Sequence, residues 1–188
     1  MSLELRTPRL ILRQLVAEDT AAMFAYRSHP QVVQYQLWEP RDVDEVREFI
    51  ARLQNVPLGT PGTWYQLAIV RKEDGMLIGD CGIHFPPDET HQAEVGITIA
   101  PDQQRRGYAA EALQIVFEML FTQRGMHRIF GRVDPRNAAS VALLERLGMR
   151  REGHLRESVW VRGEWTDDLL YAILESEWDT RRPSSRHT

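Results

Sequence analysis

The sequence contains one cysteine, Cys81, in 188 residues, so no disulfide can form within the chain. It has no apolar run close to the roughly 18–20 residues that a membrane-spanning helix requires. Its N-terminus also lacks the basic and then apolar segments of a secretory signal. These absences lead us to expect a cytoplasmic protein with no membrane partner.

The chain also lacks an excess of positive charge. The chain has 23 Lys and Arg against 27 Asp and Glu, for a net charge of -4, and its pI is about 5.9. A free-standing nucleic-acid-binding domain normally has a basic face, so we expect no nucleic-acid partner. The six histidines are scattered, and none has a metal-ligand spacing to Cys81, so we expect no metal site.

The hydrophobic content of 43% suits a single domain with a sizeable core. Apolar spacing predicts helices and strands in alternation. The strands are expected at 7–13, 64–70, 76–85, 92–100, 128–133, 149–161 and 165–174, and the helices at 21–26, 42–53, 107–123 and 134–147. Mostly antiparallel strands precede βαβ-like units, which predicts a mixed α/β domain with a six- or seven-stranded central sheet and about four helices. We expect this domain to span residues 1–178 and a charged tail to follow at 179–188.

The most informative stretch is a loop between the predicted strand 92–100 and the predicted helix 107–123. Its sequence, Gln104-Arg-Arg-Gly-Tyr-Ala109, has the pattern Q-x-x-G-x-A. The first amides of a helix lack carbonyl partners, and the helix dipole adds positive potential there. Because Gly107 and Ala109 are small, a ligand can approach the backbone closely. The stretch therefore indicates a pyrophosphate cradle, with an ordinary turn around Gly107 as the alternative.

In this context the loop resembles the acyl-coenzyme A loop of the GCN5-related N-acetyltransferases (GNAT). It matches neither G-x-x-x-x-G-K-[ST] nor G-x-G-x-x-G, the commoner phosphate-binding patterns. Asn137-Ala-Ala-Ser140 and the following Leu143-Leu-Glu-Arg-Leu-Gly-Met149 resemble a second region of the same family. The resemblance implies a GNAT-like fold and acetyl-coenzyme A (acetyl-CoA) as cofactor.

Three further stretches narrow the resemblance. They are the opening Leu5–Arg13, the turn Arg162-Gly-Glu-Trp-Thr-Asp-Asp168, and Ile173–Trp178. These resemble the subgroup that contains the Rim-type ribosomal-protein N-terminal acetyltransferases, and the likeness covers about residues 5–178. The subgroup also holds enzymes that acetylate small amines and antibiotics, so the acceptor stays open.

The resemblance implies a set of site residues. Those expected to bind the cofactor are Ile97, Ile99, Gln104, Arg105, Arg106, Gly107, Tyr108, Ala109, Ala110, Asn137 and Ser140. Ser140 would protonate the departing thiolate, and Glu94 would accept the proton of the amine. His84 is the rival base, because an unperturbed histidine titrates near neutral pH.

Each of these residues also has a purely structural interpretation. Asn137 is a favourable helix N-cap, and Ser140 then lies in the first helical turn. Glu94 could form a cross-strand pair, and His84 could be a hydrogen-bonded sheet residue. Arg105 and Arg106 could be solvated, although their place in the loop favours phosphate contacts.

Aromatic residues supply the candidates for acceptor binding. We expect Tyr35, Trp38 and Trp160, together with His84, to line the acceptor pocket, with at least one of the aromatic residues in the core instead. Cys81 is expected to be a small buried side chain rather than a nucleophile.

The predicted activity is transfer of an acetyl group from acetyl-CoA to a primary amine by direct attack in a ternary complex. The favoured acceptor is the N-terminal α-amine of a protein or peptide. A small-molecule amine or antibiotic is the alternative acceptor, and a non-catalytic acyl-CoA-binding domain is the alternative function. The chain is expected to be a monomer or a homodimer.

Overall fold

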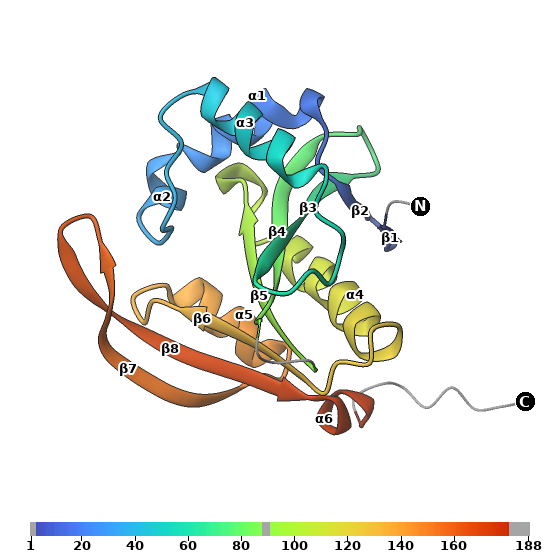
Figure 1. The fold of residues 1–188 in the computed structure, drawn as a ribbon, viewed down its shortest axis with the longest axis vertical. Coiled ribbons are helices and arrows are strands. Elements are labelled where there is room, and N and C mark those ends of the chain that lie inside the picture. Colours follow the sequence, from blue (N-terminus) through green and yellow to red (C-terminus); the bar gives the residue numbers. More distant parts are fainter. Residues whose placement is uncertain (1–2, 88–90, 181–188) are drawn as a thin grey trace, which may run out of the picture.

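The computed structural model describes residues 3–87 and 91–180, which form one eight-stranded sheet (Figure 1). The strand order is β1-β2-β3-β4-β5-β6-β8-β7, and only β5 and β6 are parallel neighbours. The strands are β1 (Glu4–Arg6), β2 (Leu10–Gln14), β3 (Thr63–Arg71), β4 (Leu77–Phe85), β5 (Gln92–Ile99), β6 (Arg128–Val133), β7 (Arg150–Val161) and β8 (Glu164–Leu174).

The α/β fold class is confirmed, but the sheet has eight strands instead of the six or seven predicted. The segment 7–13, predicted as a single strand, begins with a turn. The Leu10 N–H donates to Thr7 Oγ1 at 2.9 Å, and the Thr7 N–H donates to the Leu10 carbonyl at 3.0 Å. This turn separates β2 from the three-residue strand β1, which is too short to show an alternating pattern in the sequence.

Six α-helices lie in the described part of the chain. They are α1 (Thr20–Arg27), α2 (Pro30–Val33), α3 (Val43–Leu53), α4 (Tyr108–Thr122), α5 (Ala138–Arg146) and α6 (Glu175–Asp179), with 3-10 turns η1 (Ala17–Asp19) and η2 (Pro101–Gln103). The four helices of eight or more residues match the predicted ones. Helices α2 and α6 are too short for an apolar stripe to reveal them. Across residues 3–87 and 91–180, no helix is long and apolar enough to cross a lipid bilayer.

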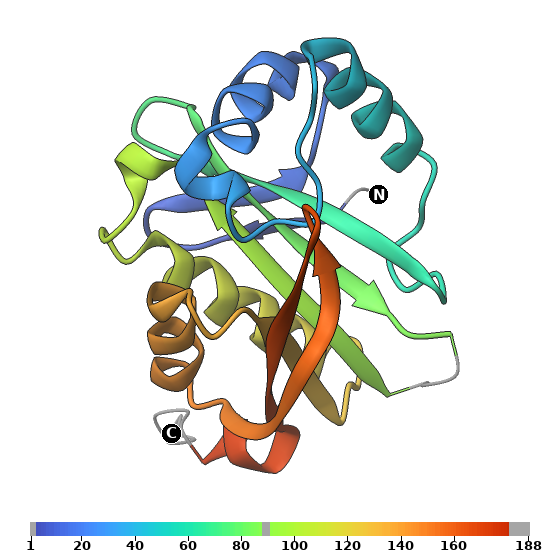
Figure 2. The same cartoon turned by 90° about the vertical axis from the view of Figure 1, so that its left-hand side faces the viewer.

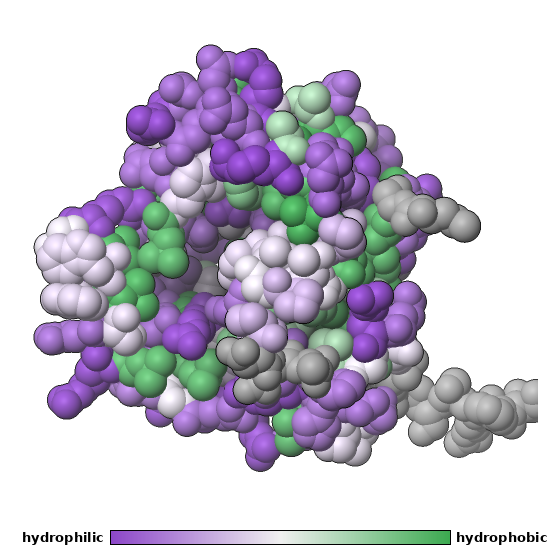
Figure 3. Space-filling view, in the orientation of Figure 1, coloured by the Kyte–Doolittle hydropathy of each residue, from purple (hydrophilic) through white to green (hydrophobic). Residues whose placement is uncertain are grey.

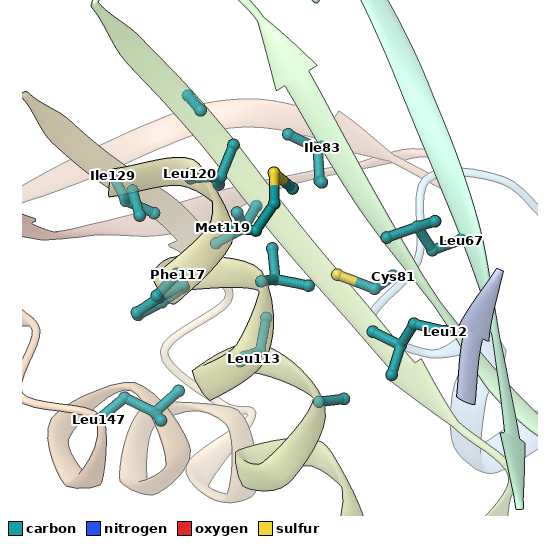
Figure 4. Packing of buried hydrophobic residues seen from close by; sticks show 14 of the residues in the cluster. Leu12, Leu67, Cys81, Ile83, Leu113, Phe117, Met119, Leu120, Ile129 and Leu147 are labelled. Carbon is teal, nitrogen blue, oxygen red and sulfur yellow. The ribbon is translucent and has the colours of Figure 1, made fainter. Parts of the chain in front are cut away.

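Helices α4 and α5 cover one face of the sheet and enclose the larger core. Figure 4 shows Leu113, Met119 and Leu120 of α4 next to Cys81 and Ile83 of β4. Cys81 is fully buried, as predicted, and burial followed by the nearby Asp80 charge raises the pKa of its thiol. A thiol in this environment is not an available nucleophile.

Helices α1 and α3 cover the opposite face through Met23, Tyr26, Val46 and Ile50. The alternation along β5 matches the prediction, because Val95 and Ile99 belong to the α4 core while Glu94 and Thr98 point to the other face.

The sheet opens near its middle, between β5 and β6. The parallel strands β5 and β6 pair over only three positions, and the last pair is Glu94 with Phe130. Beyond it the strands separate. The β7–β8 hairpin extends beyond the sheet, and its tip lies near α2 (Figure 1, Figure 2).

Candidate active site

The loop that precedes α4 has a strained, well-anchored backbone. Gln104 Nε2 donates to the Ile99 carbonyl at 3.0 Å and so ties the loop to the end of β5. Gly107 is left-handed, with φ of 82°, and Arg105 is left-handed with φ of 60°. Glycine adopts this conformation without the steric cost that other residues meet. The glycine predicted to shape the loop is therefore required by its backbone.

This conformation leaves the amides at the start of α4 free. Among the described residues, no acceptor receives the backbone N–H groups of residues 105–110. The first backbone donor of the helix to find a partner is Glu111, which bonds the Gly107 carbonyl at 3.1 Å. Arg105 and Arg106 are exposed beside these amides. Free amides, the helix dipole and two cations form a site that fits the pyrophosphate of coenzyme A.

A contact that sequence reasoning missed holds this loop in place. Glu111, in the first turn of α4, accepts hydrogen bonds from Thr7 Oγ1 at 2.6 Å and from Arg9 Nε at 2.6 Å. Arg9 NH1 donates to the Arg106 carbonyl at 3.0 Å, and the guanidinium lies 4.6 Å from the centroid of Tyr108. Burial acts against ionisation of Glu111, but the bonds from Thr7 and Arg9 outweigh it and lower its pKa. Tyr108 is itself buried, so its side chain offers little surface to a ligand.

Glu94 occupies the position at which β5 and β6 separate. It lies in a cross-strand row with Trp64, His84 and Phe130. His84 Nδ1 is 3.6 Å from Glu94 Oε2, which is beyond hydrogen-bond distance, and this buried nitrogen has no other partner among the described residues. Trp64 stacks on the other side of His84, with 5.1 Å between ring centroids.

Two charged residues that the sequence did not single out adjoin Glu94. Arg132 Nε lies 3.9 Å from Glu94 Oε1. Asp168 is only 8% exposed, and its carboxylate accepts no hydrogen bond within the described ranges. Burial and then the Asp168 charge raise the pKa of Glu94, while Arg132 and His84 act in the opposite direction, and the net shift is upward. Burial also raises the pKa of Asp168. Only strand pairing brings these groups together, since they come from β5, β6 and β8.

Asn137 and Ser140 stand at the start of α5. Asn137 caps the helix, because its Oδ1 accepts the Ser140 N–H at 3.1 Å. The capping interpretation of Asn137 is therefore confirmed. The Ser140 hydroxyl is half-buried and has no hydrogen-bond partner in the described part of the chain, so it is available for another role.

The residues predicted to bind the acceptor separate into two groups. A pocket of about 480 Å³ lies between α2, the loop after β6 and the hairpin tip, and its lining includes Tyr35, Arg136 and Arg162. Tyr35 donates to the Arg136 carbonyl at 3.3 Å across this pocket. Figure 3 shows a hollow on this side of the molecule, between the hairpin and the ends of β3 and β4.

Trp38 and Trp160 are not among the lining residues of this pocket. Trp38 packs on Phe49 of α3, with 4.6 Å between ring centroids. It is thus the aromatic residue that joins the core. Trp160 is 57% exposed and lies edge-on to Trp165. Along β8, Trp165 and Asp168 point to opposite faces, which directs the tryptophan pair away from Glu94.

Known proteins are similar to this chain in sequence. The family model described as an acetyltransferase (GNAT) domain matches residues 9–150. The N-acetyltransferase p20 of Bacillus licheniformis is 31% identical over 175 residues, covering 93% of this chain and 97% of that protein. The ribosomal protein uS5-alanine N-acetyltransferase of Escherichia coli K12 is 30% identical over 92 residues, covering 49% of this chain and 47% of that protein.

Solved structures show the same fold. An acetyltransferase of the GNAT family from Bacillus anthracis superimposes with a TM-score of 0.83 at 27% identity, covering 93% of this chain and 100% of that chain. The spermidine N-acetyltransferase of Vibrio cholerae, solved with CoA and spermine, has a TM-score of 0.78 at 25% identity, covering 92% of this chain and 99% of that chain. The chain therefore belongs to the GNAT family, and it is an acetyltransferase that uses acetyl-CoA.

Proposed function

We propose that this enzyme acetylates a primary amine, and that its acceptor is the N-terminal α-amine of a protein or peptide. The observation that carries the proposal is Glu94, a partly buried carboxylate at the point where β5 and β6 separate, with a pKa above its ordinary value. A base with a raised pKa is better suited to accept a proton near neutral pH.

The energetics favour an α-amine over a lysine side chain. An α-amine has a pKa of about 7.7–8.0 and a lysine side chain about 10.4. At pH 7 the free-amine form costs about 1 kcal/mol for the first and about 4–5 kcal/mol for the second. A single carboxylate such as Glu94, helped by water, suits the smaller free-energy cost of deprotonating an α-amine.

The proposed reaction takes place in a ternary complex. Acetyl-CoA, when bound, supplies the acetyl group as a thioester. The backbone amides of residues 105–110 hold the pyrophosphate, while Asn137 and the backbone of Ile97 and Ile99 hold the pantetheine arm. A backbone amide of β5 near Val95 polarises the thioester carbonyl. This assignment is supported by the unpaired edge of β5 beyond Glu94.

Two side chains move protons in this scheme. The acceptor nitrogen forms a bond to the carbonyl carbon, the carbon–sulfur bond breaks, and Glu94 takes the proton that the nitrogen loses. Ser140 donates its hydroxyl proton to the departing thiolate and regains one from solvent. Most of the acceleration comes from holding the two substrates in attack geometry.

The pocket lined by Tyr35 and Arg162 is the proposed acceptor entrance, because it opens between α2 and the β7–β8 hairpin. The proposed α-amine acceptor is supported by the similarity to the E. coli relative, which is a ribosomal protein uS5-alanine N-acetyltransferase. A polyamine is the second candidate. Asp168 favours it, because a buried carboxylate without a hydrogen-bond partner can hold the second cation of a diamine.

The test is a panel of acceptors assayed with acetyl-CoA for release of free thiol. It contains peptides with a free α-amine, the same peptides blocked at the N-terminus but carrying lysine, spermidine, and an aminoglycoside. We expect the highest kcat/KM for the free α-amines. Acetylation restricted to lysine side chains or aminoglycosides would contradict the proposed acceptor, and a preference for spermidine would select the second candidate. Thiol release with none of these amines would contradict both candidate acceptors.

A further inference from the structure

We propose that Gly96 is a specificity-determining position, and that the open space above it receives the carbon skeleton next to the acceptor amine and limits its size. The inference rests on the proposed function, because it takes the Glu94 face of the sheet as the acceptor side. It concerns a residue that neither the loop pattern nor the family resemblance singles out.

Two neighbouring glycines create the space. Gln66, Gly82 and Gly96 lie side by side on β3, β4 and β5. The next row on the same face of the sheet, toward the C-terminal end of β4 and the N-terminal end of β5, contains His84 and Glu94. Two adjacent glycines therefore remove the side chains from the sheet surface directly beside the proposed base.

The two glycines have different surroundings. A Cβ atom at Gly82 would lie 2.8 Å from Trp64 Cε3 and 2.9 Å from Gln66 Oε1, so the Trp64 ring already covers that position. A Cβ atom at Gly96 would have no heavy atom within 4 Å. Strand β6 adds nothing beside Gly96, since its pairing with β5 ends at Glu94. The space above Gly96 is thus open toward the gap between the strands, with Trp64 as its wall.

This space is placed to orient an amine. Residues two apart on a strand share a face and are about 6.5–7 Å apart along it, so Glu94 and Thr98 flank the space above Gly96. Thr98 is buried and closes one end, while the Glu94 carboxylate stands at the other. An alkyl group resting on Gly96 against the Trp64 ring would direct its amine toward Glu94. A larger side chain at position 96 would occupy the same volume.

Gly96 can be substituted without breaking the fold. Its φ is not in the left-handed region, unlike that of Gly107, and the Cβ position is free. A β-branched residue also suits a strand interior. Gly96→Ala and Gly96→Val therefore probe the space itself. Gly153→Val is the matched control, because β7 lies three strands away from β5 and a Cβ atom there would make an ordinary contact with Leu170, at 3.8 Å.

The experiment compares binding of coenzyme A with binding of two adducts. In one adduct the coenzyme A sulfur is joined through an acetyl bridge to the α-amine of an alanine-initiated tetrapeptide, and in the other to butylamine. Calorimetry gives each Kd for wild type, Gly96→Ala, Gly96→Val and Gly153→Val. We expect the coenzyme A Kd to stay within about twofold for all variants. One excess methylene in a pocket is worth about 10–200-fold, so Gly96→Val should weaken the adducts by at least about tenfold and Gly96→Ala by less.

The outcomes separate the two hypotheses. Equal changes for coenzyme A and both adducts, or no change in the adducts, would overturn the role of Gly96. If the wild type binds the peptide adduct no more tightly than coenzyme A, the peptide acceptor fails, and the butylamine adduct still decides Gly96. Loss of adduct binding in Gly96→Val would support the acceptor space above Gly96 even if Glu94→Gln kept full activity. That second result would contradict only the role of Glu94 as the base.

Discussion

Arg9 and Glu111 are 102 residues apart in the sequence, yet they make a two-point contact. The Arg9 N–H donates to Glu111 Oε1 at 2.9 Å, and Arg9 Nε donates to Glu111 Oε2 at 2.6 Å. The same guanidinium holds the Arg106 carbonyl. These three bonds of Arg9 reach the loop or the first turn of α4, so the residue that precedes β2 supports the cradle of free amides.

Removing this contact should weaken cofactor binding selectively. Hydrogen bonds to charged groups are worth about 1.5–3 kcal/mol each, so Arg9→Gln should raise the KM for acetyl-CoA about tenfold or more. The KM for the acceptor should change little, because Arg9 contacts the loop and helix that follow β5, whereas Glu94 lies near the beginning of that strand. Steady-state kinetics with each substrate varied in turn measures the difference. Arg9→Lys keeps the charge without the planar fork and should recover only part of the loss. Parallel increases in both KM values would mean that Arg9 stabilises the fold only.

Gly107→Val tests the cradle directly. Valine at φ of 82° is strained, and its side chain would fill the approach to the amides of residues 105–110. We expect coenzyme A affinity to fall at least about tenfold, as measured by calorimetry. Ala109→Val provides a second variant without backbone strain, because Ala109 is helical. Unchanged affinity in both variants, with native circular dichroism, would remove the pyrophosphate from this loop.

Ser140→Ala tests the proposed proton donor. General acid catalysis contributes about 10²–10⁴-fold, so turnover should fall by that order while the Kd of coenzyme A stays the same. Asn137→Ala should behave differently, because loss of a helix N-cap costs about 1 kcal/mol of stability and the variant would also lose the proposed pantetheine contact. Stopped-flow turnover and thermal melts distinguish the two residues. Turnover of Ser140→Ala within about twofold of wild type would leave Ser140 as an ordinary helix residue.

The charges around Glu94 predict opposite pH shifts. Glu94 must be ionised to accept a proton, so kcat/KM should fall as pH drops through its raised pKa. Asp168 raises that pKa, and Asp168→Asn should move the acid limb to lower pH. Arg132 lowers it, and Arg132→Gln should move the limb to higher pH. His84 is the other titratable group facing Glu94, and His84→Gln should leave an acid limb in place.

Carbon-13 NMR titration of labelled glutamate, with Glu94→Gln to assign the signal, measures the same shifts without turnover. Shifts in the same direction for Asp168→Asn and Arg132→Gln would exclude direct charge effects. A pH–rate profile of Glu94→Gln identical to that of wild type would remove Glu94 as the base and favour His84.

A buried ion pair supports the acceptor side of the sheet. Asp80 is fully buried and accepts from Tyr26 Oη at 2.5 Å, from Arg27 and from Gln66. Arg27 also donates to Gln36 Oε1 at 3.1 Å, in the segment next to the proposed acceptor entrance. Asp80→Ala leaves Arg27 buried without its partner and should cost about 3–5 kcal/mol in urea unfolding. The double variant Asp80→Leu with Arg27→Met should recover much of this stability but still raise the acceptor KM. A single-variant loss below about 1 kcal/mol would show that the pair is solvated.

The sequence alone determined the local features of this protein, namely the loop before α4, the longer helices and strands, and the cap of α5. The Q-x-x-G-x-A loop predicted the free amides, because a glycine that starts a helix and the lack of earlier carbonyls are properties of neighbouring residues. Apolar periodicity likewise predicted the four longer helices and the strands from β3 to β8. Asn137 was recognisable as a cap for the same reason. Strand β1 and the short helices escaped because three to five residues carry no periodic signal.

Tertiary structure alone decided what surrounds the proposed base. Glu94, Arg132 and Asp168 belong to three strands whose order and register depend on long-range pairing, so their mutual effect on the pKa of Glu94 has no signal in the sequence. The contact between Arg9 and Glu111 closes a loop of about a hundred residues. The difference between Gly82, covered by Trp64, and Gly96, left open, arises only when β3 and β5 flank β4 and β6 diverges. Patterns within one element are local, whereas a pocket is defined by which elements become neighbours.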